Sequence, residues 1–319
     1  MSKSGISFVP TMEAPNRAPP GRLSLQLHGR SFRSFGCRNG LALLICGQKR
    51  RHFFVWDAVT GDKHHLPFPP WLFDLGPNTV AGFNAAVLRA VGDVHFQVVF
   101  VATNMDTRQV LACLYSSETG LWGDLISTPI PSEFPNVYPD IVFLPSNVLV
   151  GNSIYWIVSS STLETHAILE FDLKSQSLAV IPVPVEHMLK FGQHTYRVMR
   201  AEGGELGFFY LSSFTAQLWR RKTDCDGVYS WVLGRTIELD KLLSLNTGNG
   251  WVPLIRGFAE NNNVVFLGTN IGVFMVHLES LKFKNLFEPS ISLYYHPLEC
   301  VYTAGIGGEH DADDLLHNT

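Results

Sequence analysis

One pattern, an apolar strand followed by a polar turn and a second strand, recurs five times along the chain. The clearest copies are VWDAVTGDKHHLPFPP (55–70), CLYSSETGLWGDLISTPIP (113–131) and ILEFDLKSQSLAVIPVP (168–184), with looser copies at 217–239 and 274–289. The equivalent points in the five copies are Trp56, Tyr115, Phe171, Trp219 and Val276, at intervals of 59, 56, 48 and 57 residues. A recurring interval of this size in a strand-rich sequence indicates a propeller or another repeat array.

Two more strand-like runs precede each hairpin. In the second unit they are AGFNAAVLRAVG (81–92) and HFQVVFVAT (95–103), and they are joined by short Gly-containing turns typical of hairpins. Four strands per unit are what a propeller blade contains. We therefore predict an all-β fold, a β-propeller with kelch-like four-stranded blades and five clear units. Two packed sandwiches are the weaker alternative, because the units are regular.

Strand-like remnants at both ends of the chain predict how the ring closes. ISFVPT and LSLQL lie near the start, and LECVYTAGI lies near the end. Propellers commonly place strands from both termini in one blade, which protects the sheet edges. We expect a composite closing blade, with a strand-bearing extension at 1–29, the propeller at 30–305 and a disordered acidic tail at 306–319.

Charge and cysteine usage exclude several classes of protein. The net charge is −4 and there is no long basic run, which argues against nucleic-acid binding. The five cysteines are scattered and form no Cys-x-x-Cys pair, so neither a disulfide framework nor a zinc site is predicted. No secretory signal or membrane-length apolar run is visible, and we expect a cytoplasmic or nuclear protein.

A set of short motifs, in order along the chain, resembles a known family. GCRNGLALLIC, VWDAVTGD, ACLYSSETGLWG, ILEFDLKSQSLAVI, MRAEGGELGF and GVFMVHLESLKFKNLFE are similar to the F-box-associated C-terminal region of plant F-box proteins, most of all the grass-type set. Each motif is weak alone, but their order is specific, and it covers about Ile6 to Gly305. The resemblance implies a β-propeller-like domain that recognises the protein to be ubiquitylated.

The resemblance also implies partners. In that family an N-terminal F-box binds a Skp-type adaptor, which connects to a cullin in an SCF-type ubiquitin ligase. No F-box-like segment precedes ISFVPT in this sequence. The adaptor and cullin are therefore expected as partners only if the full-length product carries an F-box, whereas an unknown target protein is expected in either case.

The residues that could take part in catalysis or metal binding are better explained by structural roles in the blades. His64 and His65 are adjacent in a strand and point to opposite faces, so they do not easily share a metal. Asp57 and Asp172 occupy the same place before a turn in two repeats, where Asp can accept hydrogen bonds from backbone amides two residues on. GNSIY (151–155) lacks the last Gly and the strand-to-helix setting of a nucleophile elbow. We predict no catalytic, cofactor-binding or metal-binding residue.

The connections between second and third strands and between blades share one face of a propeller, and here the sequence varies most. These segments are rich in Pro, aromatic and charged residues, which suit protein interfaces when a rigid scaffold presents them. We predict a protein-binding face with aromatic anchors and steering arginines. Its candidate residues are Arg50, Arg51, Trp71, Phe73, Arg108, Phe134, Tyr138 and Trp251.

Three hypotheses follow for function. The leading one is a non-enzymatic recognition module of the F-box type. The second is a propeller enzyme acting on a small molecule or sugar, which predicts His or carboxylate side chains converging on the central channel with perturbed pKa values. The third is a remnant or decoy that holds a target protein without ligase activity.

Overall fold

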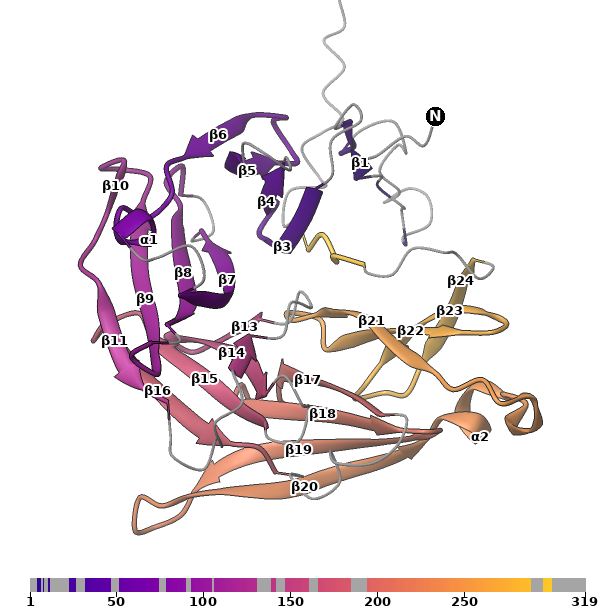
Figure 1. Cartoon of the computed structure of the whole chain (residues 1–319). Helices are drawn as coiled ribbons and strands as arrows, with labels where there is room; N and C mark the ends of the chain where they lie inside the picture. The colour runs from indigo at the N-terminus through magenta and orange to yellow at the C-terminus, as the bar shows by residue number, and fades with distance from the viewer. Residues whose placement is uncertain are drawn as a thin grey trace, which may run out of the picture.

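Five antiparallel sheets surround a central axis in the computed structural model (Figure 1). It describes residues 5–6, 8, 11, 23–26, 32–46, 52–74, 79–89, 93–104, 106–130, 139–141, 147–160, 166–184, 194–287 and 295–299. Each sheet follows the chain from an inner strand beside the axis to an outer strand at the rim. The predicted β-propeller is confirmed, with five blades.

The blades are numbered in chain order. Blade 1 contains β3 (Phe32–Arg38), β4 (Leu41–Cys46), β5 (His52–Asp57) and β6 (Lys63–Leu66). Blade 2 contains β7 (Val80–Leu88), β8 (Gln97–Asn104), β9 (Gln109–Ser116) and an outer strand split into β10 (Leu121–Trp122) and β11 (Ile126–Pro129). Blade 3 has a split inner strand, β12 (Pro139–Ile141) and β13 (Asn147–Val150), then β14 (Ser153–Ser160), β15 (His166–Asp172) and β16 (Ser177–Pro182).

The last two blades are the most regular. Blade 4 contains β17 (His194–Arg200), β18 (Leu206–Ser212), β19 (Thr215–Thr223) and β20 (Tyr229–Glu238). Blade 5 contains β21 (Leu254–Ala259), β22 (Val264–Thr269), β23 (Gly272–His277) and β24 (Phe283–Phe287). The five equivalent points predicted from the sequence all lie on third strands, namely β5, β9, β15, β19 and β23. The predicted repeat therefore has the correct register.

Three short helical segments lie on connections between blades within the described residues. They are α1 (Trp71–Asp74), α2 (Leu239–Leu243) and the 3₁₀ turn η2 (Thr247–Asn249). No helix in the described part of the chain is long and apolar enough to cross a membrane.

Apolar residues on both faces of each sheet hold neighbouring blades together. In β4 every residue is buried, and alternate side chains point to opposite faces. Leu41 and Leu43 join the core between blades 1 and 2, whereas Ala42 and Leu44 join the opposite cluster. This two-sided burial explains why the central strands read as continuous apolar runs.

The two ends of the described chain meet beside blade 1. β1 (Gly5–Ile6) pairs with β2 (Leu25–Gln26). Leu25 packs on the face of blade 1 that carries Trp56, and Leu298 packs against the same cluster. Figure 1 shows β1 near blade 1, with the yellow segment 295–299 between β3 and β21.

The closure of the ring is described in part. Among the described residues it consists of a two-stranded sheet and one extended segment, which is bonded to β21 by Tyr295 N–H donating to the Arg256 carbonyl at 2.9 Å. The rest of LECVYTAGI and the tail predicted at 306–319 lie outside the described residues.

Aspartates close the blade turns as predicted. The Asp57 carboxylate accepts hydrogen bonds from the amides of Val59 at 2.9 Å and Thr60 at 3.2 Å. Asp172 accepts equivalent bonds from Lys174 and Ser175. Asp57 also pairs with Arg89 of blade 2 at 2.7 Å, so its turn is tied to the neighbouring blade. Burial alone would raise the pKa of Asp57, but the hydrogen bonds from Arg89 and from the two amides lower it more. The pKa of Asp57 is therefore below its usual value.

Candidate binding face and axial cavity

The connection face is the face formed by the turns between second and third strands and by the links between blades. Phe73, in α1, lies here and is 74% exposed. Trp251 follows η2 on the link into blade 5 and is 65% exposed. Arg108 lies in the exposed turn between β8 and β9. These three predicted residues are on the surface of the predicted face.

Trp71 lies differently from Phe73, although both belong to α1. Its ring packs into the core between blades 1 and 2, with its centroid 5.9 Å from that of Phe100. The indole N–H donates to the Cys113 sulfur at 3.4 Å. Trp71 thus fixes the connection onto the propeller.

The other four candidates, Arg50, Arg51, Phe134 and Tyr138, lie outside the described residues.

Sequence reasoning missed two apolar residues on the connection face of blade 5. Leu254 begins β21 and pairs with Gly268, and Ile271 lies in the turn from β22 to β23. Both are exposed, at the same end of the sheet as Trp251. A signal was available, because Ile271 is an apolar residue in the turn TNIG, where polar residues are usual.

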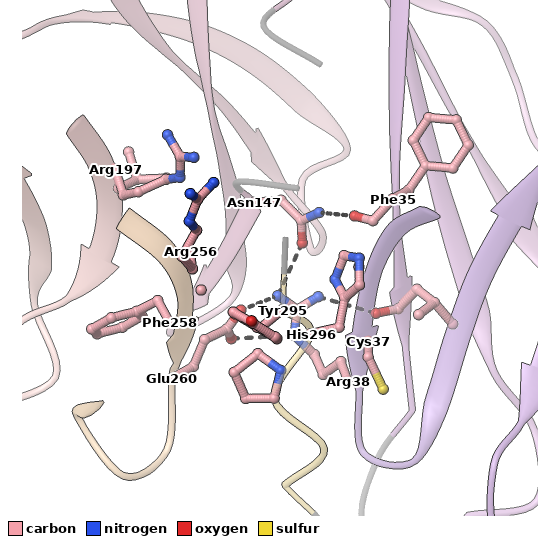
Figure 2. Close-up of a pocket in the computed structure, with 15 residues that line it drawn as sticks. Phe35, Cys37, Arg38, Asn147, Arg197, Arg256, Phe258, Glu260, Tyr295 and His296 are labelled. Carbon is pink, nitrogen blue, oxygen red and sulfur yellow. Dashed lines mark hydrogen bonds and ion pairs between the residues drawn. The ribbon is translucent and has the colours of Figure 1, made fainter. Parts of the chain in front are cut away.

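A cavity of about 50 Å³ lies on the propeller axis, and the inner strands of all five blades contribute to its wall (Figure 2). Arg38 of β3 is the central side chain. It forms an ion pair with Glu260 at 2.5 Å and donates to the Val87 carbonyl and the Asn147 amide oxygen, each at 3.0 Å. One guanidinium therefore joins blades 1, 2, 3 and 5.

Asn147 completes this network from blade 3. Its amide nitrogen donates to the Phe35 carbonyl at 3.0 Å, while its oxygen accepts from Arg38. Nothing in the local sequence marks these residues, since Arg38 and Glu260 are 222 positions apart. Only the closed ring brings them together.

Two further arginines line the cavity, Arg197 of β17 and Arg256 of β21. Figure 2 shows both guanidinium groups on the same side of the cavity, away from the Arg38–Glu260 pair. Arg197 is only 9% exposed and donates to the Tyr196 carbonyl at 2.7 Å. Arg256 lies against Gly268, where an added Cβ would be 2.5 Å from its Nε. The absence of a side chain at Gly268 therefore makes room for Arg256.

The segment 295–299 forms the remaining wall of the cavity. A Cβ at Gly257 would lie 2.6 Å from the Tyr295 carbonyl oxygen, so glycine permits the close approach of this segment to β21. The Glu299 carboxylate accepts bonds from the amides of Asn261 and Asn262 at 3.0 and 3.1 Å. Burial nevertheless raises the pKa of Glu299 above its usual value.

His296 is the titratable group that sequence reasoning did not single out. It is half-buried against the cavity, and desolvation lowers the pKa of its imidazole to about 4. It is therefore neutral at pH 7.

The adjacent histidines lie far from this wall. His64 and His65 are exposed on the outer strand β6, and their rings contact Phe96 and Phe54 respectively. No group of three or more His, Cys, Asp or Glu side chains in the described portion of the chain is arranged to hold a metal ion.

One family of known proteins matches most of the chain. A family model described as F-box protein AT5G49610-like, beta-propeller, matches residues 35–295. The match runs from β3 through blade 5 to the first residue of segment 295–299, which we call the axial segment. A search of curated proteins found no significant match.

Several solved structures resemble the chain at low identity. A prolyl endopeptidase is 12% identical with a TM-score of 0.38, over 82% of this chain and 37% of that one. The WD40 domain of SCAP from fission yeast is 11% identical with a TM-score of 0.39, over 91% and 59%. The β-propeller domain of Cps50 (Swd1) from Myceliophteria thermophila is 10% identical with a TM-score of 0.39, over 81% and 87%. The chain thus spans less than two thirds of the first two structures.

Proposed function

Because this chain belongs to the F-box protein AT5G49610-like beta-propeller family, we propose that it is a non-enzymatic protein-recognition module. We further propose that it is the substrate-binding part of an F-box subunit of a plant SCF-type ubiquitin ligase, acting in the cytoplasm or nucleus. The observation that carries the proposal is the family match, which reaches from blade 1 to the axial segment. Its target would be a protein, held on the connection face.

The exposed apolar residues of the connection face support this assignment. Large aromatic side chains in the centre of an interface commonly carry most of its binding energy. Trp251, with Leu254 and Ile271 at the same end of blade 5, provides such an anchor, and Phe73 provides a second one on the link from blade 1 to blade 2. The blades behind them are packed on both faces, which holds the connections in place.

The recognition role is tested by quantitative affinity capture from plant extract. Trp251→Ala and Phe73→Ala should each lose the same specific proteins, because a hot-spot truncation typically costs about 2 kcal/mol or more of binding free energy. Tyr229→Ala is the matched control, since Tyr229 is also an exposed aromatic but lies beside the opposite face, after the turn from β19 to β20. Equal capture by all three variants would contradict the proposed face.

The ligase role is tested separately, by probing the same captured material for the Skp-type adaptor and the cullin. Specific recovery of both supports the ligase assignment for this chain. Recovery of target proteins without either would leave recognition in place and favour the decoy hypothesis over ligase activity.

An enzyme at the axial cavity is the less favoured reading. Acid–base catalysis requires groups that exchange protons in reach of a substrate. Among the described residues of the wall, Glu260 is the sole carboxylate, and both of its oxygens accept bonds from Arg38. His296 is the sole imidazole there, so the described wall does not bring together several His or carboxylate groups. The closely bonded pair suits a structural role that links blades 1 and 5.

A further inference from the structure

The outer strand of blade 4 differs from those of the other blades. β20 has ten residues, whereas the other described outer strands have two to six. One edge of β20 pairs with β19, and no other described strand pairs with its second edge. Eight of its ten residues are exposed, and Figure 1 shows it at the rim of the ring, with the β19–β20 turn projecting outward. An edge strand of this kind directs backbone N–H and C=O groups towards solvent at every second residue.

Apolar side chains gather on the first half of this strand. Val228, Tyr229, Val232 and Leu233 are all exposed, Tyr229 at 60% and Leu233 at 43%. Because side chains alternate along a strand, Tyr229 and Leu233 lie on one face of the sheet and Val232 lies on the other. The run VYSWVLG (228–234) contains no charged residue and no proline. A run of this composition on an exposed edge is a template for pairing with another strand.

The outer strands of the other blades carry residues that prevent such pairing. Lys63 begins β6, Lys284 lies in β24, and Pro129 and Pro182 end β11 and β16. Lysine and proline at a sheet edge discourage pairing with a second chain. β20 has neither. The β-bulge of its hairpin comes after Leu233, so the apolar part of the strand is regular.

Contacts within the chain hold the β19–β20 hairpin in place. In its turn, the Asp224 carboxylate accepts hydrogen bonds from the amides of Asp226 at 3.0 Å and Val228 at 2.8 Å. In its strand, the indole N–H of Trp231 donates to the Pro182 carbonyl of blade 3 at 2.9 Å. An edge that is ordered in advance loses less conformational entropy when it pairs with another strand.

The charge of the strand fits a second copy of the same chain. Two identical strands bring like charges together unless the paired segment is neutral, and like charges opposite one another destabilise a sheet. The apolar part of β20 is neutral, although the whole chain has a net charge of −4. An antiparallel pair centred on Trp231 would place each Tyr229 opposite Leu233 of the other copy, which buries exposed apolar side chains on both sides of a two-fold axis.

We propose that the chain forms a homodimer in which β20 of one copy pairs antiparallel with β20 of the other. Each blade 4 offers one outer edge, so the pairing closes at two copies. The paired segment is shorter than the roughly 20–30 residues per side of a standard interface, so the dimer should be weak, with mostly monomer at about 1 µM and mostly dimer at about 200 µM. This inference goes beyond the proposed recognition role and does not rest on it, because it is measurable on the purified chain alone.

The first test is sedimentation velocity of the purified full chain across this concentration range. Val232→Lys and Leu233→Lys should each weaken dimerisation by about tenfold or more, because each places a charge on both copies of the paired edge. Val94→Lys is the matched control, since Val94 is 81% exposed in the turn between β7 and β8. This variant should dimerise within about twofold of wild type, because its charge lies away from the edge.

The second test needs no variant and therefore does not depend on how a substitution affects folding. Amide hydrogen exchange of the unaltered chain is compared at the two ends of the concentration range. Alternate amides of residues 229–233 should exchange more slowly at the higher concentration, because they become hydrogen-bonded to the other copy. The amides of β16, the outer strand of blade 3, should exchange equally at both concentrations.

Four results would overturn the proposal. A chain that stays monomeric over the whole range would exclude self-pairing and leave the edge to a strand from another protein. A dimer that forms equally in wild type, Val232→Lys and Leu233→Lys would place the interface elsewhere, as would a dimer with unchanged exchange in β20. Growth beyond the dimer would indicate non-specific association, because the pairing of two edges leaves none for a third copy.

Discussion

His296 should make the stability of the propeller depend on pH. Burial lowers the pKa of this imidazole from about 6.5 to about 4 in the folded protein. Between these values the unfolded chain binds a proton that the folded chain does not. The free energy of unfolding therefore falls as the pH drops from about 6.5 towards 4, and this contribution is constant above about 7.

The size of the effect follows from the same two pKa values. One pKa unit corresponds to about 1.4 kcal/mol, so the full effect is about 3 kcal/mol. Between pH 7.5 and pH 5.0 the single-site linkage relation gives a loss of about 2 kcal/mol. That is a large share of the roughly 5–15 kcal/mol that stabilises a typical domain.

The assay is urea unfolding at pH 7.5 and 5.0 for wild type and His296→Gln. Glutamine is polar and of similar size but does not titrate, so the variant should lose about 2 kcal/mol less than wild type over this interval. Other groups also titrate here. The raised pKa of Glu299 gives extra stability at lower pH, and the lowered pKa of Asp57 gives a loss at still lower pH. Both remain in the variant and cancel in the difference.

The reasoning fails if the two proteins lose the same free energy between the two pH values. It also fails if His296→Gln becomes more sensitive to acid than wild type. Either result would mean that the imidazole accepts a proton as readily in the folded chain as in water.

Two further predictions concern contacts between blades and with the axial segment. Gly257→Ala places a methyl group 2.6 Å from the Tyr295 carbonyl oxygen, and it should cost about 1–3 kcal/mol of unfolding free energy by urea titration. An unchanged midpoint would show that the segment does not lie against β21. Asp57→Ala should cost about 2 kcal/mol or more, because it leaves the Arg89 guanidinium and two amides without their acceptor. Asp172→Ala removes the same kind of turn bond without an ion pair to a neighbouring blade, so it should lower the urea midpoint less; an equal loss would refute the importance of the Asp57–Arg89 pair.

The blades could be predicted from the sequence because their pattern is local. A third strand, its turn and the outer strand lie within about 20 consecutive residues in the clearest copies. Asp57 and Asp172 accept bonds from amides within three positions. The connection face followed from the order of the strands. Phe73, Arg108 and Trp251 lie there as the alternation of turns requires.

The remaining features depend on distant parts of the chain. Trp71 and Phe73 are two positions apart in α1, yet one packs on Phe100 and the other is exposed. A helix of four residues has too little periodicity to distinguish them. The Arg38–Glu260 pair across the axis had no local signal at all, because its members come from the first and last blades.

The order in which the closing contacts are made has a consequence for synthesis of the protein. The face of blade 1 with Leu44 and Trp56 is covered by apolar side chains from both ends of the chain, Leu25 and Leu298 among them. Leu298 follows Trp56 by 242 positions, so at roughly 5–20 residues per second it leaves the ribosome about 12–48 seconds later. During that interval an apolar face of the first blade is exposed to water. A chaperone that recognises apolar surface would bind this face until the last blade closes the ring.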